Sequence, residues 1–425
     1  MNYQINTSEY LDEKEYIFSL PTGLKIIIVP KKGFTKTCAM FAVNFGSTTC
    51  SFKDKGEQDF KTIPDGVAHF LEHKLFESEE GDAFSMYAKT GASANAYTSF
   101  NVTNYYFSST DKLEENLEIL IKLMSTPYFT DENVKKEQGI IGQEINMYLD
   151  NPGWRVYFNM LQGLYELNPV KADIAGSVES ISEITPDLLY ECYNRFYTPE
   201  NMVLSICGDV DPVKVAEFCE SKIGNLGNIK DTEVKTIKEP KEICENKKTQ
   251  TLSVSMPLFN IGFKDTPPKK GKSLIKQEII GKMALDMVFG KSSEFYDKCY
   301  KESLINDSYD IDYECEPNFC HAIIAGEAKD PDMVLEKAVI EAEKVLKSGV
   351  KDEDFKRQLN IEKSIFIKEF GSVEATARNI MESYFGEYSL FDVSDIIDTI
   401  EKQDILEKLK IFTKENAVLS VILPK

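Results

Sequence analysis

The chain has 425 residues, of which 42% are hydrophobic and 28% charged, and its formal net charge is −21. This length exceeds one compact core and predicts two domains of roughly 200 residues, while the composition excludes a disordered or collagen-like chain. The acidic balance argues against nucleic acid as a partner, because phosphates need a basic surface.

Targeting and redox signals are the next feature. The first 20 residues are polar and acidic, so we expect no secretory signal. No run of about eighteen apolar residues occurs, so we expect no integral membrane protein. The nine cysteines are odd in number and form no paired zinc-knuckle pattern, which predicts a reducing, cytoplasmic location.

The first half of the chain alternates predicted strands and helices. Residues 23–30 and 37–47 are rich in β-branched and aromatic residues and predict strands. A helix is predicted over 65–76 from apolar residues at helical spacing. Two neighbouring strands follow at 92–100 and 103–110, and then a long helix with an apolar stripe from Leu113 to Met124.

The order of elements then repeats. The charged segment 224–248 is predicted to be a linker between a first domain at 1–223 and a second at 249–425. In the second half we expect a strand at 251–263, helices at 274–289 and 331–346 and a strand at 320–330. The second half is therefore predicted to be a divergent copy of the first.

One stretch supports the duplication directly. The sequence from Thr130 to Ile145 can be laid over that from Lys351 to Phe366 without a gap. Under this overlay Glu137 falls on Gln358 and Glu144 on Ile365. The second copy would then keep the scaffold but lose the acidic residues, which confines the chemistry to the first half.

Two of the three histidines, His69 and His73, lie four positions apart in the helix predicted over 65–76, with Glu72 between them and Asp65 as the expected N-cap. This spacing puts both imidazoles on one helix face, which suits a catalytic zinc ion that keeps a position for water. Glu72 is then a candidate general base rather than a ligand. The alternative is two surface or core histidines beside a solvated glutamate.

A third ligand must come from elsewhere. Glu137 and Glu144 are seven residues apart and share one face of a predicted helix. Glu144 lies among apolar residues, where a carboxylate needs a cation such as zinc. From the residues alone, both glutamates could equally line an ordinary helix face. His321 falls in a predicted strand of the second half and is expected to be structural.

The segment HFLEHKLFE, with Glu144 placed 71 positions after His73, closely resembles the pitrilysin and insulinase family of zinc peptidases, whose inverted motif is HxxEH. The likeness covers most of residues 20–215. It implies that His69, His73 and Glu144 bind Zn²⁺, that Glu72 is the base and that Glu137 supports the site.

The same resemblance implies the fold and the substrate strand. The fold would be α+β, with two homologous domains that each contain a mostly antiparallel sheet with helices packed on one face, as in LuxS and the mitochondrial processing peptidases. The second copy would have no metal site. The segment GASANAYTSF resembles the family's substrate-pairing strand, which makes Ala94, Asn95, Ala96 and Tyr97 candidate substrate-binding residues.

The resemblance also bears on activity and partners. It implies a zinc endopeptidase for unfolded peptides, with a noncatalytic scaffold subunit as the alternative and a dedicated peptide-maturation protease as a narrower one. Many relatives carry a substrate-gripping arginine and tyrosine in the second half, where this chain has Tyr300 and Asp307. A related inactive subunit could supply that pair, so a heterodimer is expected before a homodimer.

Overall fold

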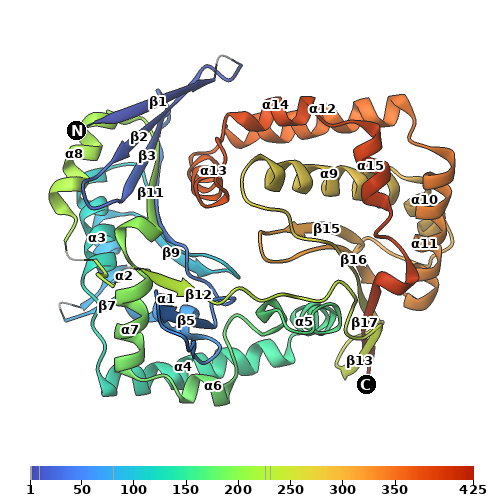
Figure 1. The fold of residues 1–425 in the computed structure, drawn as a ribbon, viewed down its shortest axis with the longest axis horizontal. Coiled ribbons are helices and arrows are strands. Elements are labelled where there is room, and N and C mark those ends of the chain that lie inside the picture. Colours follow the sequence, from blue (N-terminus) through green and yellow to red (C-terminus); the bar gives the residue numbers. More distant parts are fainter. Residues whose placement is uncertain (1, 9, 80, 225, 230) are drawn as a thin grey trace.

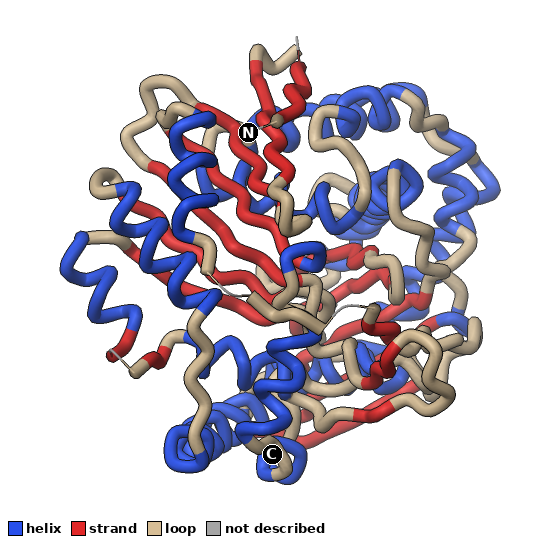
Figure 2. Tube along the Cα trace, turned by 60° about the vertical axis from the view of Figure 1, so that its left-hand side comes forward, coloured by secondary structure: helices blue, strands red, loops and turns tan. Residues whose placement is uncertain are grey.

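The computed structural model describes residues 2–8, 10–79, 81–224, 226–229 and 231–425. The chain forms two α+β halves that lie side by side, each around one large sheet (Figure 1). A view turned by 60° shows helices lying against the strands of both sheets (Figure 2).

The first half contains a seven-stranded sheet in the order β1-β2-β3-β11-β4-β10-β9. Its strands are β1 (Tyr3–Ser8), β2 (Glu13–Ser19), β3 (Lys25–Pro30), β4 (Thr37–Val43), β9 (Ser93–Thr98), β10 (Thr103–Ser109) and β11 (Met202–Gly208). β11 runs parallel to β3, and all other neighbours are antiparallel. Every residue of β11 is buried, which agrees with its mostly apolar sequence. β9 pairs only with β10 among the described residues and is therefore an edge strand.

The first half has eight α-helices among the described residues, most of which pack around its own sheet. They are α1 (Val67–Leu75), α2 (Ala83–Thr90), α3 (Leu113–Ser125), α4 (Asp131–Asp150), α5 (Pro152–Leu164), α6 (Val178–Ser182), α7 (Pro186–Phe196) and α8 (Pro212–Lys222). α1 packs on β9 and β10, and α4 packs on α1. The predicted apolar stripe of α1 is buried, including Phe70 and Leu71, which are fully inaccessible.

The start of α1 differs from the prediction. Asp65 is not the N-cap; Gly66 occupies that position, with a left-handed φ of 93° and no side-chain cap. A Cβ at Gly66 would lie 2.5 Å from the carbonyl oxygen of Ala175, so this close approach requires glycine. The carboxylate of Asp65 instead interacts with the thiol of Cys50.

The second half repeats the topology of the first. Its five-stranded sheet has the order β13-β17-β14-β16-β15. The strands are β13 (Lys247–Leu252), β14 (Leu258–Lys264), β15 (Asp310–Cys315), β16 (Cys320–Glu327) and β17 (Ala417–Pro424). Numbered by appearance within each half, this order and that of β3-β11-β4-β10-β9 are both 1-5-2-4-3, with the first strand parallel to the last. The predicted α+β fold with two homologous domains is confirmed.

Helices of the second half are α9 (Lys272–Phe289), α10 (Glu294–Lys301), α11 (Pro331–Ser348), α12 (Asp352–Glu369), α13 (Val373–Gly386), α14 (Asp392–Asp398) and α15 (Lys402–Leu409). The helices α4 and α12 begin at equivalent positions of the sequence overlay, because their N-caps are Thr130 and Lys351. Gln358, the counterpart of Glu137, is buried and donates a hydrogen bond to Asp286 of α9.

The two halves exchange equivalent helices. α5, which follows α4, packs on β14 and β17 of the second sheet, and α13, which follows α12, packs on β11 and β4 of the first (Figure 1). Gly262 of β14 permits the approach of α5, since a Cβ there would lie 2.7 Å from Met160. Ser205 of β11 donates a hydrogen bond to the carbonyl of Ala377 in α13. A hydrophobic core accordingly contains residues of both halves.

Two predicted segments have more structure than expected. The single strand predicted over 251–263 is two strands, β13 and β14, separated by a bend at residues 253–257. The segment 224–248 contains β12 (Thr232–Val234), which pairs with β5 (Ser51–Asp54), and the first two residues of β13. The domain boundaries themselves stay a prediction.

Candidate metal centre

Helix α1 presents three polar side chains near one face. His69 and His73 lie one turn apart, with ring centroids 4.5 Å from each other. Glu72 precedes His73 and is half-buried. The apolar side of α1 fixes their direction, because its core residues hold the helix against β9, β10 and α4.

Helix α4 brings two carboxylates to this face. The Nε2 atoms of His69 and His73 lie 3.8 and 3.6 Å from the two carboxylate oxygens of Glu144. Nearly two turns earlier on α4, Glu137 Oε1 lies 3.0 Å from His73 Nδ1. Glu144 and Glu137 therefore contact opposite ring nitrogens of the same imidazole.

The donor set fits a zinc ion. Potential ligand atoms of His69, His73 and Glu144 all lie within 4.8 Å of one another, and no other such group occurs in the part of the chain that the structure describes. Two imidazoles and one carboxylate are a known ligand set of catalytic zinc, which leaves a position for water. The hydrogen bond from His73 Nδ1–H to Glu137 fixes the tautomer that frees Nε2 for a metal.

The electrostatics of the two histidines differ. Burial, together with the charge of His73, lowers the pKa of His69 to about 4, so its imidazole is neutral at neutral pH, the form that binds metals. Burial alone would lower the pKa of His73, but the hydrogen bond with Glu137 and the nearby carboxylates raise it. The pKa of Glu137 is held below its usual value by His73 and Lys74 despite burial.

Glu72 contacts β9, the strand that contains the candidate substrate-binding residues. Its Oε2 accepts a 2.7 Å hydrogen bond from the hydroxyl of Thr98, the last residue of β9. Burial raises the pKa of Glu72 above its ordinary value. Such a carboxylate accepts a proton more readily near neutral pH than an exposed one does.

The candidate substrate residues lie along the free edge of the first sheet. Ala94, Asn95, Ala96 and Tyr97 occupy the middle of β9, and alternate residues face opposite sides of the sheet. Asn95 is exposed, and its Oδ1 accepts a hydrogen bond from the backbone N–H of Ala96. The unpaired edge can accept an additional strand.

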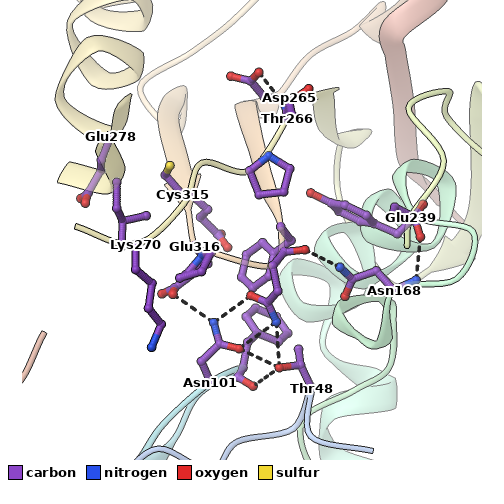
Figure 3. A pocket seen from close by; sticks show the side chains of 18 of the residues that line it. Thr48, Asn101, Asn168, Glu239, Asp265, Thr266, Lys270, Glu278, Cys315 and Glu316 are labelled. Atoms are coloured by element: carbon purple, nitrogen blue, oxygen red, sulfur yellow. Dashed lines mark hydrogen bonds between the residues drawn. The ribbon is translucent and has the colours of Figure 1, made fainter. Parts of the chain in front are cut away.

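A cavity of about 1130 Å³ lies between the halves, close to the end of β9. Residues 99–102, which follow β9, line it on one side, and Glu316 of the second half lines it on the other. In Figure 3, Asn101 bridges the halves through hydrogen bonds with Glu316 and Thr48. None of the four residues His69, Glu72, His73 and Glu144 lines this cavity.

Two residues of the second half, Tyr300 and His321, make contacts outside the metal centre. Tyr300 is exposed on α10, and a hydrogen bond with Asp307 raises the pKa of its hydroxyl. His321 is fully buried on β16, and its Nδ1 lies 3.1 Å from the hydroxyl of Tyr165. This position agrees with the structural role expected for His321.

Sequence reasoning missed three side chains that touch the candidate site. Thr98 bonds Glu72, Lys74 lies fully buried 4.0 Å from Glu137, and Tyr148 donates to Glu144. Only Tyr148 carried a signal, since it follows Glu144 by four residues on one helix face.

The chain has a duplicated α+β scaffold, and in its first half two histidines of an HxxEH helix converge with a glutamate. Together these features define an inverted-motif zinc-peptidase fold. The sequence profile described as "Insulinase (Peptidase family M16)" matches residues 61–177, and that described as "Peptidase M16 inactive domain" matches residues 183–362. An uncharacterized zinc protease of Bacillus subtilis (strain 168), YmfH, is 42% identical over 402 residues, which are 93% of each chain. This chain belongs to the insulinase family of peptidases, family M16.

Solved structures agree with this assignment. The chain is similar to an M16-like peptidase from Alicyclobacillus acidocaldarius, with 30% identity, a TM-score of 0.91 and coverage of 100% of this chain and 99% of the other. A protease from Helicobacter pylori shares the fold at 19% identity, with a TM-score of 0.84 and coverage of 97% and 100%. Within the described residues, every helix is too short or too polar to cross a lipid bilayer.

Proposed function

We propose that this chain is a zinc endopeptidase that cleaves extended peptides. The observation that carries the proposal is the convergence of His69, His73 and Glu144 beside Glu72, at the end of a free strand edge. The names of relatives such as the zinc protease YmfH support the class of reaction.

The residues divide the chemistry between them. His69, His73 and Glu144 hold the metal, and Glu137 orients His73. Zinc, when bound, supplies Lewis-acid activation of a water molecule and of the substrate carbonyl. Glu72 accepts a proton from the attacking water and later donates it to the leaving amine. Thr98 holds Glu72 toward the end of β9 where the peptide would lie.

The free edge of β9 sets the substrate class of the proposal. A peptide added beside Ala94 to Tyr97 would gain main-chain hydrogen bonds, which depend little on side-chain identity. Beyond Thr98 such a peptide reaches the cavity between the halves. Only an unfolded segment can adopt this pairing, so unfolded peptides are the proposed substrates.

Glu72→Gln tests the assignment of the base. The variant should retain one zinc per chain and its melting temperature, while kcat on a quenched fluorescent peptide falls by about 10²–10⁴-fold. Glu114→Gln, an exposed change on α3, serves as the matched control and should cleave normally. Full activity of zinc-loaded Glu72→Gln would refute the proposed mechanism.

We further propose that the active enzyme pairs with a second chain in the cytoplasm. This chain has Tyr300 and Asp307 at the positions where many relatives carry an arginine and a tyrosine that grip the substrate. A related inactive chain could supply that arginine and tyrosine in a heterodimer. A homodimer is the alternative. The nine cysteines all lie in the described part of the chain as free thiols, which supports a reducing compartment. Cleavage rates of this chain alone and mixed with a related chain test the pairing: equal rates would contradict it.

A further inference from the structure

A tyrosine hydroxyl contacts one of the three converging metal-ligand candidates directly. Tyr148 lies one helical turn after Glu144 on α4, and its hydroxyl donates a 2.5 Å hydrogen bond to Glu144 Oε1. The same Oε1 faces His69, whereas Oε2 faces His73 at 3.6 Å. Because the tyrosine occupies one oxygen, the carboxylate cannot rotate freely between the imidazoles and solvent.

Tyr148 is itself held by the only tryptophan of the chain. The rings of Tyr148 and Trp154 are stacked, with centroids 4.4 Å apart and planes 13° from parallel. Trp154 lies in the first turn of α5, where the indole Nε1–H donates a 2.5 Å hydrogen bond to Asp173 Oδ2. The Asp173–Trp154 hydrogen bond, the Trp154–Tyr148 stacking and the Tyr148–Glu144 hydrogen bond form one continuous series of contacts across α4 and α5. We call this series the brace.

The brace extends to the other ligand helix. The second oxygen of Asp173 accepts a hydrogen bond from the backbone N–H of Ala175. The carbonyl of Ala175 is the atom that lies against Gly66 at the start of α1. The loop at residues 173–176 therefore touches both the tryptophan behind Glu144 and the helix that carries His69 and His73.

We propose that Tyr148 is a positioning residue for the metal centre: with Trp154 and Asp173 behind it, its hydroxyl holds Glu144 in the orientation that presents Oε2 to zinc. This inference rests on the proposed function, because it requires zinc at the candidate site. It assigns no proton transfer to Tyr148. The hydroxyl acts through Glu144, so its loss should change the affinity for zinc rather than the chemistry of the loaded enzyme.

Tyr148→Phe tests the proposal, because phenylalanine keeps the ring that stacks on Trp154 and removes only the hydroxyl. The affinity for Zn²⁺ is measured by competition with a chromogenic chelator on metal-free protein. Loss of an outer-shell partner should weaken zinc binding by about 10–100-fold. Tyr193→Phe is the matched control: it removes a buried hydroxyl that donates to the carbonyl of Met124, and zinc affinity should stay at the wild-type value.

A second readout separates positioning from catalysis. In a zinc buffer that fully loads Tyr148→Phe, peptide cleavage should return to within a few-fold of the wild-type kcat. A kcat that stays low at full zinc occupancy would overturn the positioning role and assign Tyr148 to the reaction itself. Wild-type affinity for zinc in Tyr148→Phe would overturn the inference outright.

Trp154→Phe tests the same series of contacts in a second variant, so the proposal can be tested even where Tyr148→Phe does not fold. It keeps an aromatic ring for stacking but removes the hydrogen bond to Asp173, so it should weaken zinc binding in the same direction by a smaller factor. Unchanged affinity in this folded variant would contradict the brace. The wild-type chain is measured in parallel: failure of the wild type to bind zinc would refute the proposed function itself, an outcome distinct from equal binding by wild type and variants.

Discussion

Glu137 contacts the candidate metal centre through His73. Its Oε1 bonds His73 Nδ1 at 3.0 Å, and its Oε2 lies 4.0 Å from the ammonium of Lys74, which is fully buried and also pairs with Glu77. A buried carboxylate between a ring N–H and an ammonium stays ionised, so it remains a charged acceptor for the imidazole.

At the scale of single residues, Glu137→Gln should therefore weaken zinc binding about tenfold while peptide cleavage by the fully loaded variant is largely retained. The amide still accepts a hydrogen bond from His73, but it carries no charge. Chelator competition measures the affinity. Equal zinc affinity in variant and wild type would show that Glu137 only fills space beside α1.

The ligand candidates could be predicted from sequence because a spacing of four residues fixes a common helix face whatever the tertiary structure. His69 and His73 followed from that rule. Glu137 and Glu144, seven residues apart, shared one predicted helix face, and the family resemblance implied their roles. Thr98 could not be found in this way, because its hydroxyl meets Glu72 only after β9 packs on α1.

At the scale of elements, the position of α1 depends on Gly66. Asp65 was a reasonable N-cap from sequence, but the contact between Gly66 and the carbonyl of Ala175 selects a left-handed residue at the cap instead. Such tertiary contacts are absent from local patterns. By contrast, the overlay equates Thr130 with Lys351, and these residues are the N-caps of α4 and α12.

Gly66→Ala should lower the free energy of unfolding by about 1–3 kcal/mol, because alanine is strained at φ 93° and its Cβ would meet the carbonyl of Ala175. Urea denaturation measures the change. Gly139→Ala is the opposite control: this exposed residue lies within α4 with no atom near its Cβ, and alanine there should stabilise by about 0.5–1 kcal/mol. Unchanged stability of Gly66→Ala would contradict the account of the helix start.

At the scale of the whole molecule, the exchanged helices α5 and α13 join the halves. The order of the predicted strands indicated the duplication. The exchange of α5 and α13 could not be predicted, because the sequence of an amphipathic helix does not show which sheet its apolar face packs on. Gly163 of α5 shows the closeness of the contact: a Cβ there would lie 2.5 Å from Val418 of β17.

Because each sheet is covered by a helix of the other half, the two halves should unfold together. Urea unfolding followed by the fluorescence of Trp154, which lies on α5, and by far-ultraviolet circular dichroism should give one coincident transition. Gly163→Ala should lower the urea concentration at the midpoint by the same amount in the fluorescence and circular-dichroism curves. Two separated transitions would show that the halves are independent units.

The central claim is that this chain is a peptidase that depends on one zinc ion at His69, His73 and Glu144. The most direct measurement determines zinc content and peptide cleavage in the same samples of this chain, alone and mixed with a related partner chain. Each sample is measured before chelation, after chelation, and after one equivalent of Zn²⁺ is returned. We expect one zinc per chain, loss of cleavage on chelation and recovery with one equivalent. Cleavage that persists in the metal-free protein, or a purified chain that binds no zinc, would contradict it.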